Sequence, residues 1–161
     1  MQAFHLPNGL RRWFVIAGVL ALFSWSPLSR AQQRVERDGV AVYWGLVPEA
    51  IVSQQHAIEE LHGGPPPGGG KINHLVLAVF DAKTGRRIDD AIIRAQLVEP
   101  GIVDQPPRYL PPMPVNGVGS YGQLFGMVYD GPYRFRVWVK LPERPAEIEF
   151  TIDAVSQLRN R

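Results

Sequence analysis

The chain has 161 residues, 45% of them hydrophobic, with 17 Lys and Arg against 15 Asp and Glu and no cysteine. This length suits one domain, and the apolar content is sufficient for a packed core, which excludes wholesale disorder. The lack of cysteine excludes disulfide scaffolds, thiolate metal sites and cysteine nucleophiles.

The first 31 residues have the layout of a secretory signal peptide. A basic pair, Arg11 and Arg12, precedes an apolar run over 13–23, and Ala31 ends a small-residue cleavage box. The run is about half as long as the roughly 20 residues that a transmembrane helix needs. We therefore expect a mature chain that begins at Gln32 and works in the periplasm, without stable membrane insertion. An uncleaved anchor lying in the membrane interface is the alternative.

Cleavage also changes the charge of the chain. The signal segment removes three arginines and leaves 14 basic against 15 acidic residues, a net charge of −1. The remaining basic residues are scattered among acidic ones and form no patch. We therefore expect no nucleic-acid binding and no polybasic membrane contact.

The mature chain begins with an N-terminal segment, 32–70, of mixed character. Residues 32–39 are polar and predict a frayed lead-in. Alternation over 40–44 predicts a short strand, and the spacing of apolar residues over 48–61 predicts an amphipathic helix. The Gly- and Pro-rich block 63–70 can be neither helix nor strand, so it predicts a hinge or a surface loop.

From Lys71 the hydrophobic period changes to two, which is typical of strands. We expect strands, in chain order, over 71–82, 88–98, 121–129, 133–140 and 147–152. The Pro-rich stretch 100–114 predicts at most an edge strand around Tyr109 and Leu110.

The last two strands alternate apolar with charged residues, which is typical of antiparallel sheets with one buried face. The sequence therefore predicts an all-β fold: an antiparallel immunoglobulin-like β-sandwich of six or seven strands over 71–153, with one short N-terminal helix. We expect the tail over 154–161 to be loose.

Motifs of catalysis are missing from the sequence. There is no G-x-S-x-G, and the glycine-rich block lacks the lysine and the following helix of a phosphate-binding loop. Asp89 and Asp90 are adjacent carboxylates, but they are typical of a solvated turn. We therefore expect a protein that is not an enzyme.

Histidine and methionine supply the candidate metal ligands, because imidazole and thioether bind copper in an oxidising compartment. The glycine-rich loop could fold His62 back beside His74, which opens the long strand. Met113 lies in a proline-rich stretch, an unusual place for a core side chain. Met127 alternates with aromatic residues in its strand, so core packing is its alternative role.

Three stretches resemble bacterial exported immunoglobulin-like domains of the YtkA-like type and, more loosely, CopC-like and transthyretin-like modules. They are the stretch from His74 to Ala91 with its D-x-x-T-G turn, the G-S-Y-G that ends at Gly122, and the hairpin from Asp130 to Val139. The resemblance covers 71–152 and specifies the fold better than an activity.

The segment from Gly45 to Gly64, together with His74, is similar to a subgroup of uncharacterised periplasmic proteins. This resemblance implies a metal-associated binding domain, with copper or iron as the ion. CopC-like sites use an amino-terminal histidine, whereas the expected first residue here is Gln32. A site would therefore be interior, and we expect a copper ion to be buffered or handed on, without catalysis, by His62, His74, Met113 and Met127.

A metal-free accessory module that contacts an envelope protein is the alternative function. Such a module would use the Pro-rich loops and the aromatic residues Tyr43, Trp44, Tyr109, Tyr121 and Tyr129. Trp138 either stacks under its neighbours Arg136 and Lys140 or forms a contact platform. Carbohydrate binding is a third possibility, and it requires exposed, coplanar rings.

Overall fold

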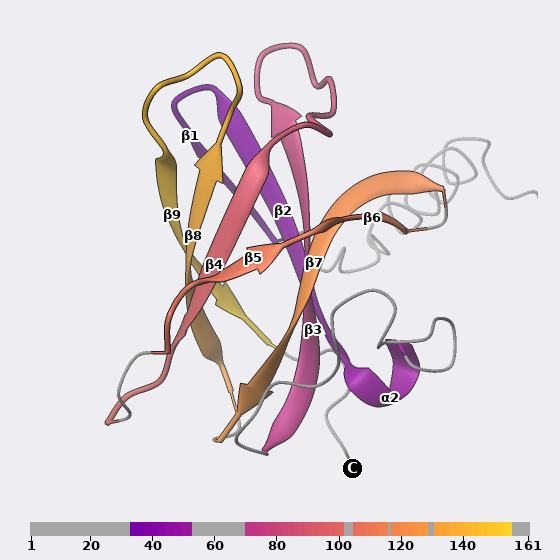
Figure 1. Cartoon of the computed structure of the whole chain (residues 1–161), viewed down its shortest axis with the longest axis vertical. Coiled ribbons are helices and arrows are strands. Elements are labelled where there is room, and N and C mark those ends of the chain that lie inside the picture. The colour runs from indigo at the N-terminus through magenta and orange to yellow at the C-terminus, as the bar shows by residue number, and fades with distance from the viewer. Residues whose placement is uncertain (1–32, 53–69, 102–104, 116, 129–130, 156–161) are drawn as a thin grey trace, which may run out of the picture. The chain divides into compact units, whose positions relative to one another are not determined.

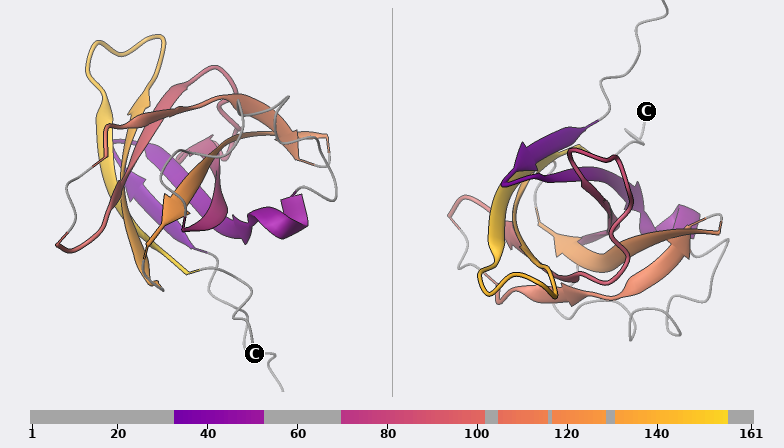
Figure 2. Two further views of the ribbon diagram at one scale, coloured as in Figure 1. Left: turned by 60° about the horizontal axis from the view of Figure 1, so that its bottom comes forward. Right: turned by 90° about the horizontal axis from the view of Figure 1, so that it is seen from above.

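A computed structural model describes residues 33–52, 70–101, 105–115, 117–128 and 131–155 (Figure 1). Sheet A joins, in spatial order, β1 (Arg34–Arg37), β2 (Val40–Pro48), β3 (Lys71–Asp81), β7 (Val118–Met127) and β6 (Pro112–Val115). Sheet B joins β5 (Arg108–Leu110), β4 (Ile92–Val98), β8 (Tyr133–Lys140) and β9 (Ile148–Ala154). Every pairing is antiparallel, and Figure 2 shows the two sheets facing each other.

The predicted all-β antiparallel sandwich is confirmed: seven of the nine strands in the described residues, β3–β9, begin within the predicted range 71–153, and β1 and β2 precede it. The prediction of a frayed lead-in over 32–39 is wrong, because β1 pairs with β2 along its whole length. This strand has a partner on one side only and is largely exposed, so its sequence needs no apolar alternation. Sheet A thus takes in residues that precede the compositional boundary at residue 71.

The first helix differs from the expected range 48–61. Strand β2 continues through Pro48, and the described helix, α2, comprises only Glu49–Val52. The rest of that range, the glycine-rich block up to residue 69, the expected signal segment and the end of the tail lie outside the described residues. Ala154 belongs to β9, so the tail begins one residue later than expected.

No helix in the described part of the chain is long and apolar enough to cross a membrane.

The main core lies between the two sheets and follows the predicted alternation. In β4, Ile93, Ala95 and Leu97 are buried as expected, whereas Ile92 and Arg94 face out. Phe125 of β7 and Phe135 of β8 meet edge to face across the core, with ring centroids 5.1 Å apart. Burial of one face of each sheet therefore explains why these strands form.

Side chains join the sheets where β9 passes β1 and β2. Arg37 Nη1 donates to the Glu149 carbonyl oxygen over 2.7 Å, and Trp44 Nε1 donates to that of Asp153 over 3.0 Å. Both acceptors lie on the edge strand of sheet B, where the next strand of a ladder would otherwise bind. These two bonds close one side of the sandwich.

The proline-rich stretch crosses from one sheet to the other. Strand β5 pairs with β4 at the edge of sheet B, which confirms the edge strand expected around Tyr109 and Leu110. Strand β6 pairs with β7 in sheet A. The crossing is at Pro111, whose carbonyl accepts a hydrogen bond of 3.1 Å from Gly122 N. Strand β6 was not predicted, because a run of prolines is usually incompatible with a ladder.

The prolines of β6 are tolerated because of where they face. Hydrogen bonding alternates along an antiparallel ladder, and the carbonyl of Pro111 points to β7. The backbone N–H and C=O groups of Met113, two residues later, therefore also point to β7, whereas the backbone nitrogens and carbonyls of Pro112 and Pro114 point away from it. The imide nitrogens thus lie on the open edge of sheet A, where no donor is needed.

Two side-chain bonds join β5 to β7 beside this crossing. Arg108 Nη1 donates to the Leu124 carbonyl over 2.5 Å, and Gln123 Nε2 donates to the Tyr109 carbonyl over 3.1 Å. Partial burial lowers the pKa of Arg108, because desolvation disfavours the charged guanidinium. These side-chain bonds join the two sheets where β5 passes β7, because the two strands belong to different sheets and share no backbone ladder.

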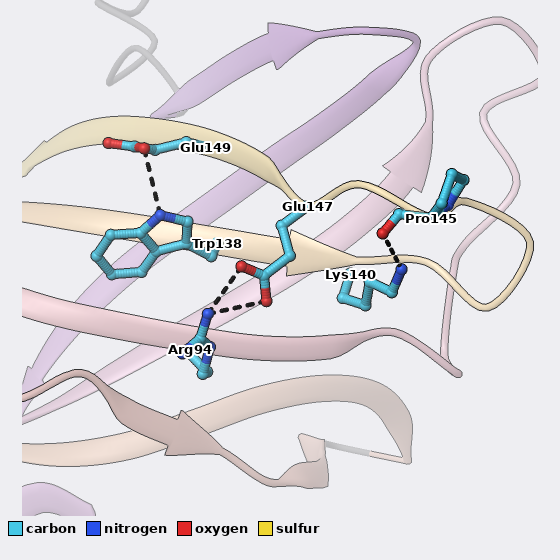
Figure 3. A network of polar contacts seen from close by, with 6 residues as sticks. All are labelled: Arg94, Trp138, Lys140, Pro145, Glu147 and Glu149. Atoms are coloured by element: carbon cyan, nitrogen blue, oxygen red, sulfur yellow. Dashed lines mark hydrogen bonds and ion pairs between the residues drawn. The ribbon is translucent and has the colours of Figure 1, made fainter.

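Trp138 lies on the outer face of sheet B in a polar network (Figure 3). The cation beside its ring is Arg94, 5.8 Å from the centroid, which comes from the facing position of β4. The expected stacking under Arg136 and Lys140 is therefore wrong for the lysine, whose Nζ instead donates to the Pro145 carbonyl over 2.6 Å. Trp138 Nε1 donates to Glu149 over 3.3 Å.

The β3–β4 connection begins with the D-x-x-T-G turn. Asp81 Oδ1 accepts hydrogen bonds from the backbone N–H groups of Lys83 and Thr84 and from the Thr84 hydroxyl, at 2.7–3.0 Å. These donors lower the pKa of Asp81, because they stabilise its ionised form.

Tyr121 in β7 holds the later part of the β3–β4 connection. Ala91 N donates to the Tyr121 hydroxyl over 3.0 Å, and that hydroxyl donates to the Ile88 carbonyl over 3.1 Å.

Replacing Tyr121 by Phe is expected to destabilise the protein by about 1–3 kcal/mol, because two backbone groups lose their partner in a buried place. The control is Tyr109→Phe. Tyr109 is 49% exposed, so this substitution should change the free energy of unfolding by less than about 0.5 kcal/mol. Urea unfolding followed by tryptophan fluorescence gives both values. Equal losses in the two variants would contradict the role of the buried hydroxyl.

The turn at Asp81 predicts a pH dependence of stability. A folded-state pKa below the ordinary value of 3.8 means that the stabilisation is complete above that pH and is lost as the pH falls through the folded value. Asp81→Asn should therefore lower the urea midpoint at pH 7, and the gap to the native protein should shrink in acid. A gap that is constant from pH 7 to the acid limit would argue against this.

Candidate metal centre

The candidate centre lies on the outer face of sheet A, the face turned away from sheet B. In the register of β3 and β7, His74 is opposite Leu124, and Val76 is opposite Gly122. Residues that face each other across a ladder project to the same side. Leu124 packs against Ile72 in a small cluster separate from the main core, so His74 and the α-carbon of Gly122 belong to this outer face.

Strand β6 brings Met113 to the same face. Met113 is opposite Ser120 in the ladder, and Ser120 is two residues from Gly122 in β7. Both candidate ligands are shielded from solvent, since His74 is 1% exposed and Met113 is 6% exposed. The crossing at Pro111 therefore places the thioether of Met113 near the buried imidazole of His74.

Gly122 leaves space between the two donor atoms. A Cβ placed on this residue would lie 2.5 Å from His74 Nε2 and 2.5 Å from Met113 Sδ. Because both atoms lie 2.5 Å from one point, twice that distance, 5.0 Å, is the largest separation that they can have. The imidazole nitrogen and the thioether sulfur therefore converge on a space that any other residue at position 122 would fill.

The upper limit on the donor separation can be compared with metal–ligand distances. Imidazole nitrogen and sulfur bind zinc at about 2.0 and 2.3 Å, so an ion in line between such donors would separate them by about 4.3 Å. The limit of 5.0 Å admits that separation. The pair supplies a borderline and a soft donor, the set that suits copper. The described residues hold no group of three or more His, Asp or Glu that could bind a metal.

The structure does not bring Met127 to this pair. Met127 belongs to the main core, on the opposite face of sheet A, and its Sδ accepts a hydrogen bond of 3.3 Å from Asn73 Nδ2. Asn73 precedes His74 in β3, and neighbouring residues of a strand point to opposite faces. His62 lies outside the described residues. Of the four expected ligands, His74 and Met113 are adjacent.

Sequence reasoning missed Gly122 and Asn73. A glycine inside a strand often marks a close approach by another group, so Gly122, between Tyr121 and Gln123, carried a usable signal. Asn73 is a polar residue at a buried position of a largely apolar strand. Its role could not be deduced without the register that places it near Met127.

The described aromatic residues of the alternative function differ in exposure, and Tyr43 and Trp44 are half-buried. Tyr121 is 1% exposed, and Trp44 packs against the main core. Tyr43 meets Phe80 edge to face at 5.3 Å, while Tyr109 is 49% exposed. Tyr129 is outside the part of the chain that the structure describes.

No protein-family model matches the chain, and no curated protein matches its sequence. Solved structures do match its fold. A copper-bound variant of FetP from uropathogenic Escherichia coli strain F11 has a TM-score of 0.58 at 13% identity and covers 76% of this chain and 93% of its own. The as-isolated FetP, recombinantly expressed in the periplasm, has a TM-score of 0.55 at 16% identity, covering 77% and 93%.

A DUF4426 family protein from Pseudomonas aeruginosa PAO1 also matches, with a TM-score of 0.55 at 10% identity, covering 79% of this chain and 97% of its own. At these identities the likeness shows the β-sandwich fold. The chain therefore resembles FetP and this DUF4426 protein in its fold.

Gly122→Ala is expected to displace both donor atoms, since the new methyl group would lie 2.5 Å from each. Both are ends of side chains that can move, so the variant should fold, at a cost of about 1–3 kcal/mol for the extra methyl group. In NMR spectra, a nuclear Overhauser effect between the His74 ring and the Met113 methyl group should be present in the native chain and weakened in the variant.

The control is Gly119→Ala in the same strand, whose methyl group would meet the Asp89 carboxylate, also at 2.5 Å. It should leave the contact between the ring and the thioether unchanged. An unchanged contact in Gly122→Ala would show that the two donors do not converge at this glycine.

Proposed function

We propose that this chain is a periplasmic copper-binding protein that holds one ion between His74 and Met113, in the space at Gly122. The observation that carries the proposal is the convergence of a buried imidazole nitrogen and a thioether sulfur on one vacant Cβ position. Glycine at this position lets both donor atoms approach to within 2.5 Å of the point where a Cβ would lie.

The donor chemistry, the fold and the N-terminal segment support the same function. Thioether and imidazole ligands suit copper, and the chain has no thiol to compete for it or to be oxidised. A copper-bound FetP has a similar fold. The apolar run over 13–23 has the layout of an export signal, which would place the protein in an oxidising compartment.

A site with few protein donors suits buffering and transfer. The described residues contribute two donors, and His62, which lies outside them, remains a third candidate ligand. We leave Met127 out of the ligand set, because its sulfur lies on the core side of sheet A and accepts a hydrogen bond from Asn73. An ion held in this way can accept a ligand from another protein, and no catalytic step is needed.

Copper should bind the exported chain at a ratio of one to one, as measured by competition with a chromophoric chelator. Met113→Leu conserves volume and removes the sulfur, so it should weaken binding by at least about tenfold, while stability changes by less than about 1.5 kcal/mol. His74→Gln should weaken binding to a similar extent, because the imidazole is lost.

Met127→Leu is the matched control, the same substitution in a methionine that is 1% exposed on the other face of the sheet. It should retain the native copper affinity. The proposal fails if Met113→Leu and His74→Gln both bind copper as the native chain does, or if Met127→Leu weakens binding as much as they do.

A further inference from the structure

The donors His74 Nε2 and Met113 Sδ have a feature in common beyond their position. An imidazole that binds a metal is neutral, and a thioether carries no charge in any state. Neither group therefore offsets the charge of an ion between them. Both residues are also buried, at 1% and 6% exposure, so water shields the ion poorly.

The cost of moving an ion from water into such a place increases with the square of its charge. A divalent ion thus loses about four times as much hydration free energy as a monovalent ion of equal size. Neutral donors recover less of that loss for a divalent ion than carboxylate or thiolate would. The electrostatics of the pair therefore favour a monovalent ion.

Ligand number and softness act in the same direction. Thioether sulfur selects soft ions, of which Cu(I) is the biological example. Zinc is almost always four-coordinate, and Cu(II) prefers a tetragonal set of nitrogen and oxygen donors. His74 and Met113 lie at most 5.0 Å apart, a separation that one ion bound between two donors can span.

We infer that the pair of His74 and Met113 selects soft monovalent cations, Cu(I) and Ag(I), over Cu(II) and Zn(II). This inference rests on the proposed function and narrows its ligand to one charge state. Gly122 is part of the selection, because a side chain at this position would lie between the ion and the two buried donors.

Silver provides the sharpest test, since Ag(I) has the charge and softness of Cu(I) but is not oxidised in air. The exported chain is titrated with Ag(I) and with Cu(I) under anaerobic reducing conditions, and separately with Cu(II) and Zn(II), each against a competing chelator. Ag(I) and Cu(I) should bind at least about 100-fold more tightly than Cu(II) or Zn(II). In NMR spectra, Ag(I) should shift the methyl resonance of Met113 and leave that of Met127 in place.

Met113→His is the informative variant, because it exchanges the soft donor for a borderline one. It should reduce the preference for Ag(I) over Cu(II) by at least about tenfold, whereas Met127→Leu should leave it unchanged. If Cu(II) binds the native chain as tightly as Ag(I) and Cu(I), and binding still depends on His74 and Met113, the inference is overturned while the proposed function stands. If none of the four ions binds, both are overturned.

Discussion

Successive residues of a strand point to opposite sides of their sheet, and this alternation controls what sheet A can do. On β3, Leu75 enters the main core, whereas His74 faces away from it. On β7, Met127 enters the core and Gly122 faces away. One sheet therefore offers two chemically different surfaces. The inner one is mainly apolar, and the outer one presents an imidazole beside a glycine.

The outer surface acquires its sulfur only because the chain changes sheets. Strand β5 completes sheet B, the chain crosses at Pro111, and β6 then extends sheet A with Met113 on the outer side. No ladder joins β5 to β7, so Arg108 and Gln123 supply the hydrogen bonds that hold the crossing in place. The position of the thioether thus depends on polar contacts some distance from it.

The sequence predicted those parts of the fold in which one apolar face repeats every second residue, as in β4, β8 and β9. It did not predict β1 or β6, because edge strands need neither apolar alternation nor a full set of donors. The candidate ligands were identified by type, but their grouping depends on register. Whether Met113 or Met127 shares a face with His74 is set by how β3, β7 and β6 pair, and the long stretch between β3 and β6 leaves that register unspecified by the sequence.

The prolines of β6 have a consequence for association between molecules of this protein. Pro112 and Pro114 turn imide nitrogens to the free border of sheet A, so an approaching strand would find carbonyls there and no amide protons at these two positions. Cross-β stacking of one molecule on another is therefore discouraged along the border that carries the thioether. The prolines on either side of Met113 therefore also make edge-to-edge pairing of two molecules less favourable at this strand.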